Sequence, residues 1–140
     1  MANTDEKMKN YYRVMLGKKS IHADTCFDGN FIGTDFGIKQ NLTNQLPDNW
    51  RSFNAKFAPV YLKAHPEKSK IAAGLACGAL WTVSRGIESG DIVLCPDGSG
   101  SYRAGEVTGS YSHAPNGPLP HRRSVTWLDT LIPRSSMSEA

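Results

Sequence analysis

The sequence lacks the features that mark several common classes of protein. No apolar run approaches the roughly 18 residues that a membrane-spanning helix requires, so we expect no membrane partner. The N-terminal segment 1–10 (MANTDEKMKN) has no apolar signal region, and nothing in it predicts export. These absences favour a cytoplasmic protein.

Cysteine is scarce, and no Cys-x-x-Cys pair is present. The three cysteines stand at positions 26, 77 and 95, an odd number at wide separation. This usage predicts buried, reduced thiols in place of a disulfide framework, as is common in the cytoplasm. His22 and Cys26 are four residues apart, but no second pair of ligands has a usable spacing. We therefore expect neither a metal nor a cofactor.

Catalytic motifs are also missing. The segment 96–105 (PDGSGSYRAG) contains a Gly-x-Gly, but it leads into a strand, whereas a phosphate-binding loop leads into a helix. No serine lies in a nucleophile elbow, and Cys77 and Cys95 lie in apolar segments that would leave their thiols inert. No paired acid and base is evident. We expect a non-catalytic domain, with an enzyme acting on a small nucleotide-like ligand as one alternative.

The composition is that of one ordinary globular domain. The chain has 140 residues, of which 39% are hydrophobic and 21% charged, enough to bury a core without disulfides. Its net charge of +3 is compatible with a nucleic-acid partner without requiring one. We expect residues 1–10 to be disordered and residues 11–140 to form a single domain.

The clearest structural pattern is a tight hairpin in the second half of the chain. Residues 92–95 (IVLC) form a short apolar run, and residues 96–101 (PDGSGS) have the glycine and proline content of a turn. Residues 102–108 form the return strand. Gly105 and Gly109 in or after this strand predict a bulge, a bend or a close approach of another group.

Further strands and helices surround the hairpin. Short apolar and aromatic runs predict strands at residues 11–16, 31–36, 80–83 and 125–128. Residues 21–28 are expected to make one or two helical turns. Residues 135–140 (SSMSEA) are expected to begin a C-terminal helix.

Two longer helices are predicted between residues 48 and 78. We expect Asp48 to cap the first helix, and Pro59 to end or kink it. Ser69 is expected to cap the second helix, which should end near Cys77. A stripe of aromatic residues at three- and four-residue spacing is expected to face the core, and it comprises Trp50, Phe53, Phe57 and Tyr61.

This order of elements favours an α+β fold. The last predicted strands follow one another too closely for the crossover helices of parallel βαβ units. We therefore predict a strongly bent mixed or antiparallel barrel that is flanked by helices.

Aromatic residues stand at the ends of several predicted elements, beside cations. A base extruded from a duplex needs aromatic faces for stacking, donors and acceptors for its edge, and cations for the flanking phosphates. For the base pocket we consider Phe31, Asp35, Phe36, Trp81, Tyr111 and His113. For contacts to the DNA backbone we consider Lys18, Lys19, Arg122 and Arg123.

Four segments resemble the EVE and YTH domains of the PUA-like superfamily. Residues 11–20 (YYRVMLGKKS) resemble a first strand that ends in a Lys-Ser pair before a short helix. Residues 30–37 (NFIGTDFG) resemble the segment that carries the first cage aromatic of YTH domains, and Phe31 falls at that position. Residues 98–107 (GSGSYRAGEV) resemble the Gly-Ser-Gly hairpin, and residues 125–139 (VTWLDTLIPRSSMSE) the closing strand and terminal helix.

The resemblance implies a PUA-like bent barrel, with a flipped-base pocket to which Ser20 and Phe31 belong. YTH domains place a second cage tryptophan in the loop after the hairpin, where this chain has Tyr111 and His113. Its helix pair is more similar to bacterial domains fused in front of modification-dependent restriction endonucleases.

The implied partner is therefore double-stranded DNA that carries a modified base. The candidate bases are methylated cytosine, hydroxymethylated cytosine and methylated adenine, and the implied role is to direct a fused effector nuclease. The same fold also supports RNA-binding modules, so RNA is the alternative partner.

Overall fold

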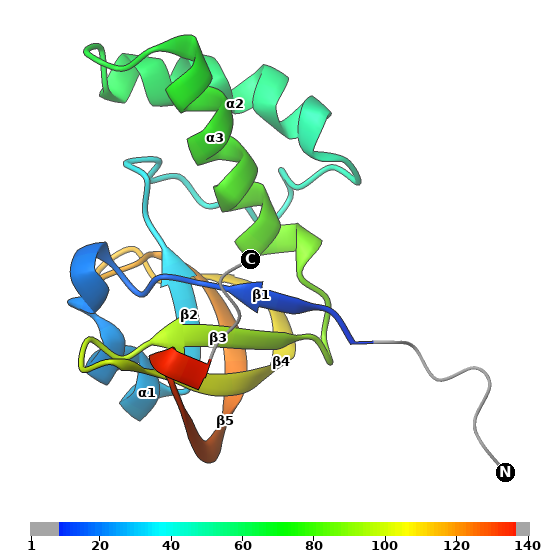
Figure 1. Ribbon diagram of the computed structural model, residues 1–140. Coiled ribbons are helices and arrows are strands. Elements are labelled where there is room, and N and C mark those ends of the chain that lie inside the picture. The colour runs from blue at the N-terminus through cyan, green and yellow to red at the C-terminus, as the bar shows by residue number, and fades with distance from the viewer. Residues whose placement is uncertain (1–8, 137–140) are drawn as a thin grey trace, which may run out of the picture.

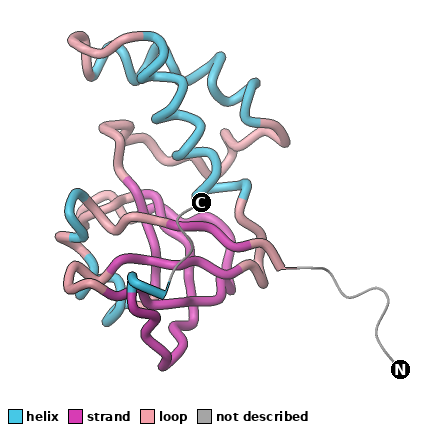
Figure 2. Tube along the Cα trace, viewed as in Figure 1, coloured by secondary structure: helices cyan, strands magenta, loops and turns pink. Residues whose placement is uncertain are grey.

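The structure of the protein is a computed structural model that describes residues 9–136. It contains a curled sheet with a pair of helices standing at one end of it (Figure 1, Figure 2). The predicted α+β class is confirmed. Residues 1–8, expected to be disordered, and residues 137–140, expected to belong to a C-terminal helix, lie outside the described part of the chain.

Five strands form one open, mixed sheet in the order β1-β3-β4-β5-β2. Their bounds are β1 (Tyr11–Arg13), β2 (Phe31–Thr34), β3 (Ile92–Pro96), β4 (Ser101–His113) and β5 (His121–Pro133). β1 runs parallel to β3, and all other neighbours are antiparallel. The predicted hairpin is confirmed as β3 and β4. The first two strands are shorter than predicted, and the last is longer.

Two irregularities bend the long strand β4. Its pairing with β5 shifts between Arg103 and Gly105, and again between Val107 and Tyr111. A Cβ added at Gly105 would lie 2.7 Å from the Trp127 ring, so only glycine lets this ring lie flat on the strand. The close approach predicted at Gly105 is therefore confirmed, and the two shifts help the sheet to curl.

Three helices accompany the sheet. They are α1 (Ala23–Gly29), α2 (Trp50–Ala64) and α3 (Lys70–Trp81), and short 3-10 turns span Lys18–Ser20 and Arg134–Ser136. The predicted cap Ser69 is confirmed, since its hydroxyl accepts from the Ala72 N–H at 3.1 Å. The cap of α2 is Asn49 and not Asp48, because the Asn49 side chain accepts from the Ser52 N–H at 2.9 Å.

Pro59 does not end α2, which continues to Ala64. The buried aromatic residues on either side of Pro59, Phe57 and Tyr61, pack into the same cluster and hold both parts of the helix in place. The expected core stripe is correct for Phe53, Phe57 and Tyr61, whereas Trp50 is exposed.

Residues 80–83 are helical, which corrects the predicted strand. α3 continues to Trp81 and is followed by a π-helical turn, η2 (Thr82–Gly86). The Thr82 hydroxyl donates to the Gly78 carbonyl at 2.9 Å, and the Trp81 ring lies over Gly86. These contacts within the helical segment outweigh the strand preference of a Leu-Trp-Thr-Val run.

Buried side chains form two clusters. One lies inside the curled sheet and includes Leu16, Ile32, Val93 and Val107. The other joins α2 to α3 and includes Leu42, Phe53, Phe57 and Leu80. Since the helix pair has its own core, the groups that bridge the two clusters decide how the pair is held on the sheet. No helix in the described part of the chain is long and apolar enough to cross a membrane.

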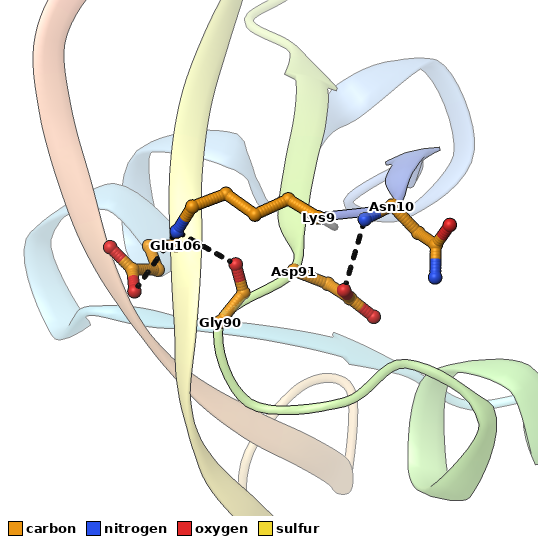
Figure 3. Close-up of polar contacts among 5 residues, drawn as sticks. All are labelled: Lys9, Asn10, Gly90, Asp91 and Glu106. Atoms are coloured by element: carbon orange, nitrogen blue, oxygen red, sulfur yellow. Dashed lines mark hydrogen bonds and ion pairs between the residues drawn. The ribbon is translucent and has the colours of Figure 1, made fainter. Parts of the chain in front are cut away.

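The first described residues are held on the sheet (Figure 3). The Asn10 N–H donates to the Asp91 carboxylate at 3.1 Å, and the Lys9 ammonium donates to the Gly90 carbonyl at 3.2 Å. Lys9 also lies 3.6 Å from the Glu106 carboxylate. The expectation of disorder up to residue 10 therefore does not hold for Lys9 and Asn10.

Trp127 attaches α1 to the sheet, and its removal should destabilise the fold. Its indole N–H donates to the Cys26 carbonyl at 3.0 Å, and its ring meets Phe27 edge-on at 4.9 Å. We expect Trp127→Ala to lower the free energy of unfolding by about 3 kcal/mol in urea titrations, through lost packing and a cavity. The exposed neighbour Leu128 is the control, and Leu128→Ala should cost less than about 1 kcal/mol. Equal costs would contradict this role.

Candidate nucleic-acid interface

The edge strand β2 and the segment that follows the other edge strand, β1, contribute to one cavity of about 420 Å³, which we call the edge cavity. Its lining comes from the segment after β1, the end of β2 and one loop residue, and comprises Met15, Gly17, Lys18, Lys19, Gly33, Thr34, Asp35, Phe36 and Leu119. A smaller cavity of about 270 Å³ shares Met15, Thr34 and Phe36 with it. The edge cavity is large enough for a small ligand or an extruded base.

Strained backbone is concentrated at the edge cavity. Lys19, Phe36 and Leu119 line it with φ angles of 57°, 57° and 55°, in the left-handed region that side chains disfavour. Ser20, next to Lys19, has a φ of 61°. Asn30, at 59°, has an ordinary explanation, because it caps the end of α1. Strain of on the order of 1–3 kcal/mol per residue persists where the fold imposes it, and it is typical of ligand-binding sites.

The side chains at the edge cavity suit a base and its phosphates. Phe36 offers an aromatic face, and Lys18 and Lys19 are exposed cations. The Asp35 carboxylate accepts from the Gly37 N–H at 3.0 Å, which fixes its position beside the cavity. A carboxylate can accept hydrogen bonds from the amino and imino groups of a base edge, while lysines attract phosphates. These four predicted residues are brought together by the fold.

Tyr111 and His113 belong to a different group, centred on the buried His121. The Tyr111 hydroxyl donates to His121 Nδ1 at 2.7 Å and accepts from the Leu42 N–H at 3.1 Å. His121 Nε2 donates to the Ile38 carbonyl. This pattern requires a neutral imidazole with its proton on Nε2. The group fastens the segment after β2 onto β4 and β5.

The expected place of Tyr111 and His113 in a base pocket is therefore corrected. His113 stacks on His121 with 5.7 Å between ring centroids, and its Nε2 contacts the Lys39 carbonyl at 3.1 Å. Neither residue lines the edge cavity. His121 was not among the residues predicted from the sequence. Its spacing of two from Arg123, which puts both on one face of a strand, is the signal that could have indicated it.

Phe31 lies in the core of the sheet, and not in the edge cavity. Its side chain is 8% exposed, and the Arg122 guanidinium covers its ring at 4.0 Å from the centroid. Arg122 also donates to the carbonyls of Leu119 at 3.0 Å and Pro118 at 2.7 Å. Arg122 thus closes the loop before β5, which corrects its expected role as a phosphate contact.

Arg123 is buried, which corrects its expected place as an exposed cation at the DNA backbone. It is 4% exposed, and its guanidinium donates to the carbonyls of Gly109 at 2.7 Å, Val83 at 3.1 Å and Ile87 at 2.6 Å. Burial lowers the pKa of Arg123, while the charge of Asp91 raises it. Nε and Nη1 are therefore held by carbonyls inside the molecule, and Arg123 contributes no exposed cation to the outer surface.

Trp81 and Ser20 also lie outside the edge cavity. The Trp81 indole N–H donates to the Pro47 carbonyl at 2.9 Å, so this ring holds the loop before α2. Ser20 is buried and lines a neighbouring cavity of about 380 Å³, together with Gly98 and Tyr102 of the β3–β4 hairpin. Lys19 lines both this cavity and the edge cavity, so Ser20 stands beside the site without facing it.

The cysteines are free and buried, as predicted. Burial raises the pKa of Cys26 and of Cys77 to about 11, and that of Cys95 further. All three thiols are therefore protonated near neutral pH and are poor nucleophiles. Among residues 9–136, no group of three or more histidine, cysteine or acidic side chains is placed to hold a metal ion.

Comparison with known proteins gives one match. Residues 12–139 match a family model described as "Domain of unknown function (DUF8426)". No curated protein and no solved structure matches the chain. The matched range contains every residue that lines the edge cavity.

The neutral state of His121 predicts a loss of stability in mild acid. Burial lowers the pKa of His121 below its ordinary value near 6.5. As the pH falls through about 6.5, the unfolded chain binds a proton that the folded protein resists, so the free energy of unfolding falls. The slope should reach at most about 1.4 kcal/mol per pH unit and should vanish above about pH 7.5.

Urea unfolding at a series of pH values between about 5 and 8 measures this effect. His121→Gln should flatten the slope even where it lowers the overall stability, since glutamine does not titrate. A variant with the same slope as the original protein would show that other groups cause the acid sensitivity.

Proposed function

Since the chain belongs to the DUF8426 family, whose function is unknown, we propose a function from the residues that form its edge cavity. The domain is a non-catalytic reader of modified DNA. It binds double-stranded DNA and takes one modified base, flipped out of the helix, into the edge cavity. Phe36 stacks on the base, Asp35 meets its polar edge, and Lys18 and Lys19 contact the flanking phosphates.

The observation that carries this proposal is the strained backbone of the edge cavity. Lys19, Phe36 and Leu119 reach the cavity from three separate segments, and each has a left-handed φ angle. Leu119 belongs to the core cluster of the sheet, and Phe36 packs against the cluster of the helix pair. The fold therefore holds both strained positions rigid, as the wall of a binding site requires. The strain is therefore best explained as the means by which an aromatic face and a cation are held ready for a ligand.

The sheet supports a PUA-like assignment within the α+β class. β1 and β2 are opposite edges in the strand order, yet residues at or beside both strands line the same cavities. A bent barrel that stays open between its edges has this arrangement. The segments that resemble EVE and YTH domains provide Lys18, Lys19, Asp35 and Phe36, which is why we prefer a flipped base to another small ligand.

The biological role that we infer is that of a sensor in a modification-dependent restriction system. The domain selects the DNA, and a fused effector nuclease cuts it in the cytoplasm. Inert thiols and the lack of a suited acid–base pair in the edge cavity agree with a binding role.

The first prediction from this proposal concerns Phe36. Base–aromatic stacking is worth about 1–3 kcal/mol, so Phe36→Ala should weaken binding of the modified duplex roughly five- to a hundredfold. The matched panel contains methylated cytosine, hydroxymethylated cytosine, methylated adenine or no modification in one sequence, as duplex DNA and as RNA. Trp50→Ala removes an exposed aromatic outside the edge cavity and should leave the affinities unchanged.

Two further results bear on this reading. A fluorescent base analogue beside the modified base should brighten on binding, because flipping removes its stacking partner. Phe36→Gly should be more stable than Phe36→Ala, since glycine adopts a positive φ without cost. Equal affinity for all duplexes, without a change in fluorescence, would reduce the domain to a general nucleic-acid binder.

The second prediction concerns Lys18 and Lys19. If both contact phosphates, the double variant to Gln should weaken modified and unmodified duplexes by similar factors. The slope of log affinity against log salt should fall by about 0.9 for each lost contact. Lys63 and Lys68 are exposed lysines near the far end of α2, and the same double substitution there is the control. Identical slopes in both double variants would exclude the phosphate contacts.

A further inference from the structure

We propose that a second cavity, beside the π-helical turn, binds a phosphate-class oxyanion. This cavity has a volume of about 500 Å³ and lies between η2, the loop before α2 and the second irregular stretch of β4. Its polar lining includes Thr43, Ser84, Arg85, Glu88, Ser110 and Arg123, and we call it the arginine cavity. The inference goes beyond the reading of a modified base and does not depend on it.

The π-helical turn η2 serves two different cavities. Thr82 and Val83 line the smaller cavity next to the edge cavity, whereas Ser84 and Arg85 line the arginine cavity. π-helical turns are rare and are frequently found at functional sites, because they reorient side chains within a helix. Here the turn leads the chain from α3 toward β3 (Figure 1). Arg85 and the buried Arg123 line the same cavity.

Arg123 gives the arginine cavity a buried positive charge. Its three hydrogen bonds come from Nε and Nη1 and all go to backbone carbonyls. Within residues 9–136, no carboxylate lies within 4.0 Å of this guanidinium. The charge of Asp91 acts on Arg123 from beyond ion-pair distance. A buried cation whose direct contacts are all dipoles favours the binding of an anion. The Nη2 group is the part of the guanidinium that is left to donate to such an anion.

Arg85 adds a second cation that can move. It is exposed and lies 2.8 Å from the Asp48 carboxylate, whose side chain is itself almost fully exposed. An ion pair of this kind is weak and can exchange one anion for another. Glu88 also lines the cavity, so the lining has two guanidinium groups and one carboxylate. The lining itself therefore has more positive than negative groups, and Asp48 is not part of it.

Hydroxyl groups complete the donor set. Ser84 is 3% exposed, and its Oγ has no hydrogen-bond partner in the described part of the chain. Buried hydroxyls are normally satisfied, so an unpaired one beside a cavity indicates a missing partner. Thr43 and Ser110 are exposed hydroxyls of the same lining. Guanidinium forks together with hydroxyls form a donor set that suits the oxygens of a phosphate.

The test is a titration of the protein with inorganic phosphate at low ionic strength, followed through the NMR signals of the arginine Nε–H groups. The Nε–H of Arg123 donates to the Gly109 carbonyl in a buried site, so its signal should be slow to exchange and well resolved. We expect saturable shifts of the Arg85 and Arg123 signals. The absence of a saturable shift at Arg123 would overturn the proposal.

Two variants with opposite expected effects sharpen this test. Arg85→Gln should weaken phosphate binding by roughly tenfold, the loss of one charge-assisted hydrogen bond. Asp48→Asn should strengthen binding by about two- to fivefold, because it removes an exposed competitor for Arg85. Lys63→Gln makes the same charge change as Arg85→Gln outside the cavity and should have little effect. Equal weakening by Arg85→Gln and Lys63→Gln would mean that net charge alone attracts phosphate, against the proposal.

The source of the phosphate is decided by competition with an unmodified DNA duplex. If the duplex shifts the same arginine signals and displaces inorganic phosphate, the anion is the DNA backbone. If it does neither, the cavity takes a free phosphate-bearing molecule. Phe36→Ala should leave phosphate binding within about twofold, because Phe36 does not line the arginine cavity. A failure at the edge cavity can thus be told apart from a failure at the arginine cavity.

Discussion

The buried guanidinium of Arg123 joins the sheet to the helix pair, which otherwise have separate hydrophobic cores. It donates to two carbonyls at the π-helical turn, from Val83 and Ile87, and to one at the irregular stretch of β4, from Gly109. At both places the backbone departs from regular helix or sheet, so these carbonyls lack the partners that regular structure would give them. A charged donor in a dry environment makes these bonds strong, and removing it would leave several buried carbonyls without a partner.

His121 acts two residues earlier on β5 and faces the same side of the strand. With Tyr111 it holds the segment that follows β2, through hydrogen bonds to Ile38 and Leu42. That segment contains Phe36, so these hydrogen bonds help to hold the strained conformation at the edge cavity. The two buried polar residues of β5 therefore support the geometry of both candidate sites, without contacting a ligand at the edge cavity.

The two sites also differ in kind. The edge cavity has exposed lysines and a half-buried aromatic, which suits a large ligand that arrives from outside. The arginine cavity has a fully buried cation and an unpaired hydroxyl, which suits a small anion. Under the proposed function the two sites would complement each other, because backbone contacts position a duplex while a pocket selects the base.

The sequence by itself determined the α+β class, the hairpin, the helix pair and the inert thiols, because these follow from local periodicity, turn chemistry and the environment of single residues. It also pointed to Lys18, Lys19, Asp35 and Phe36 as candidate binding residues, and all four line the edge cavity. Only the tertiary structure decided which polar and aromatic residues face a cavity. The Arg-Arg pair at 122–123 reads the same in the sequence whether its guanidinium groups bind phosphates or backbone carbonyls. Burial decides between the two, and burial depends on contacts between residues far apart in the chain.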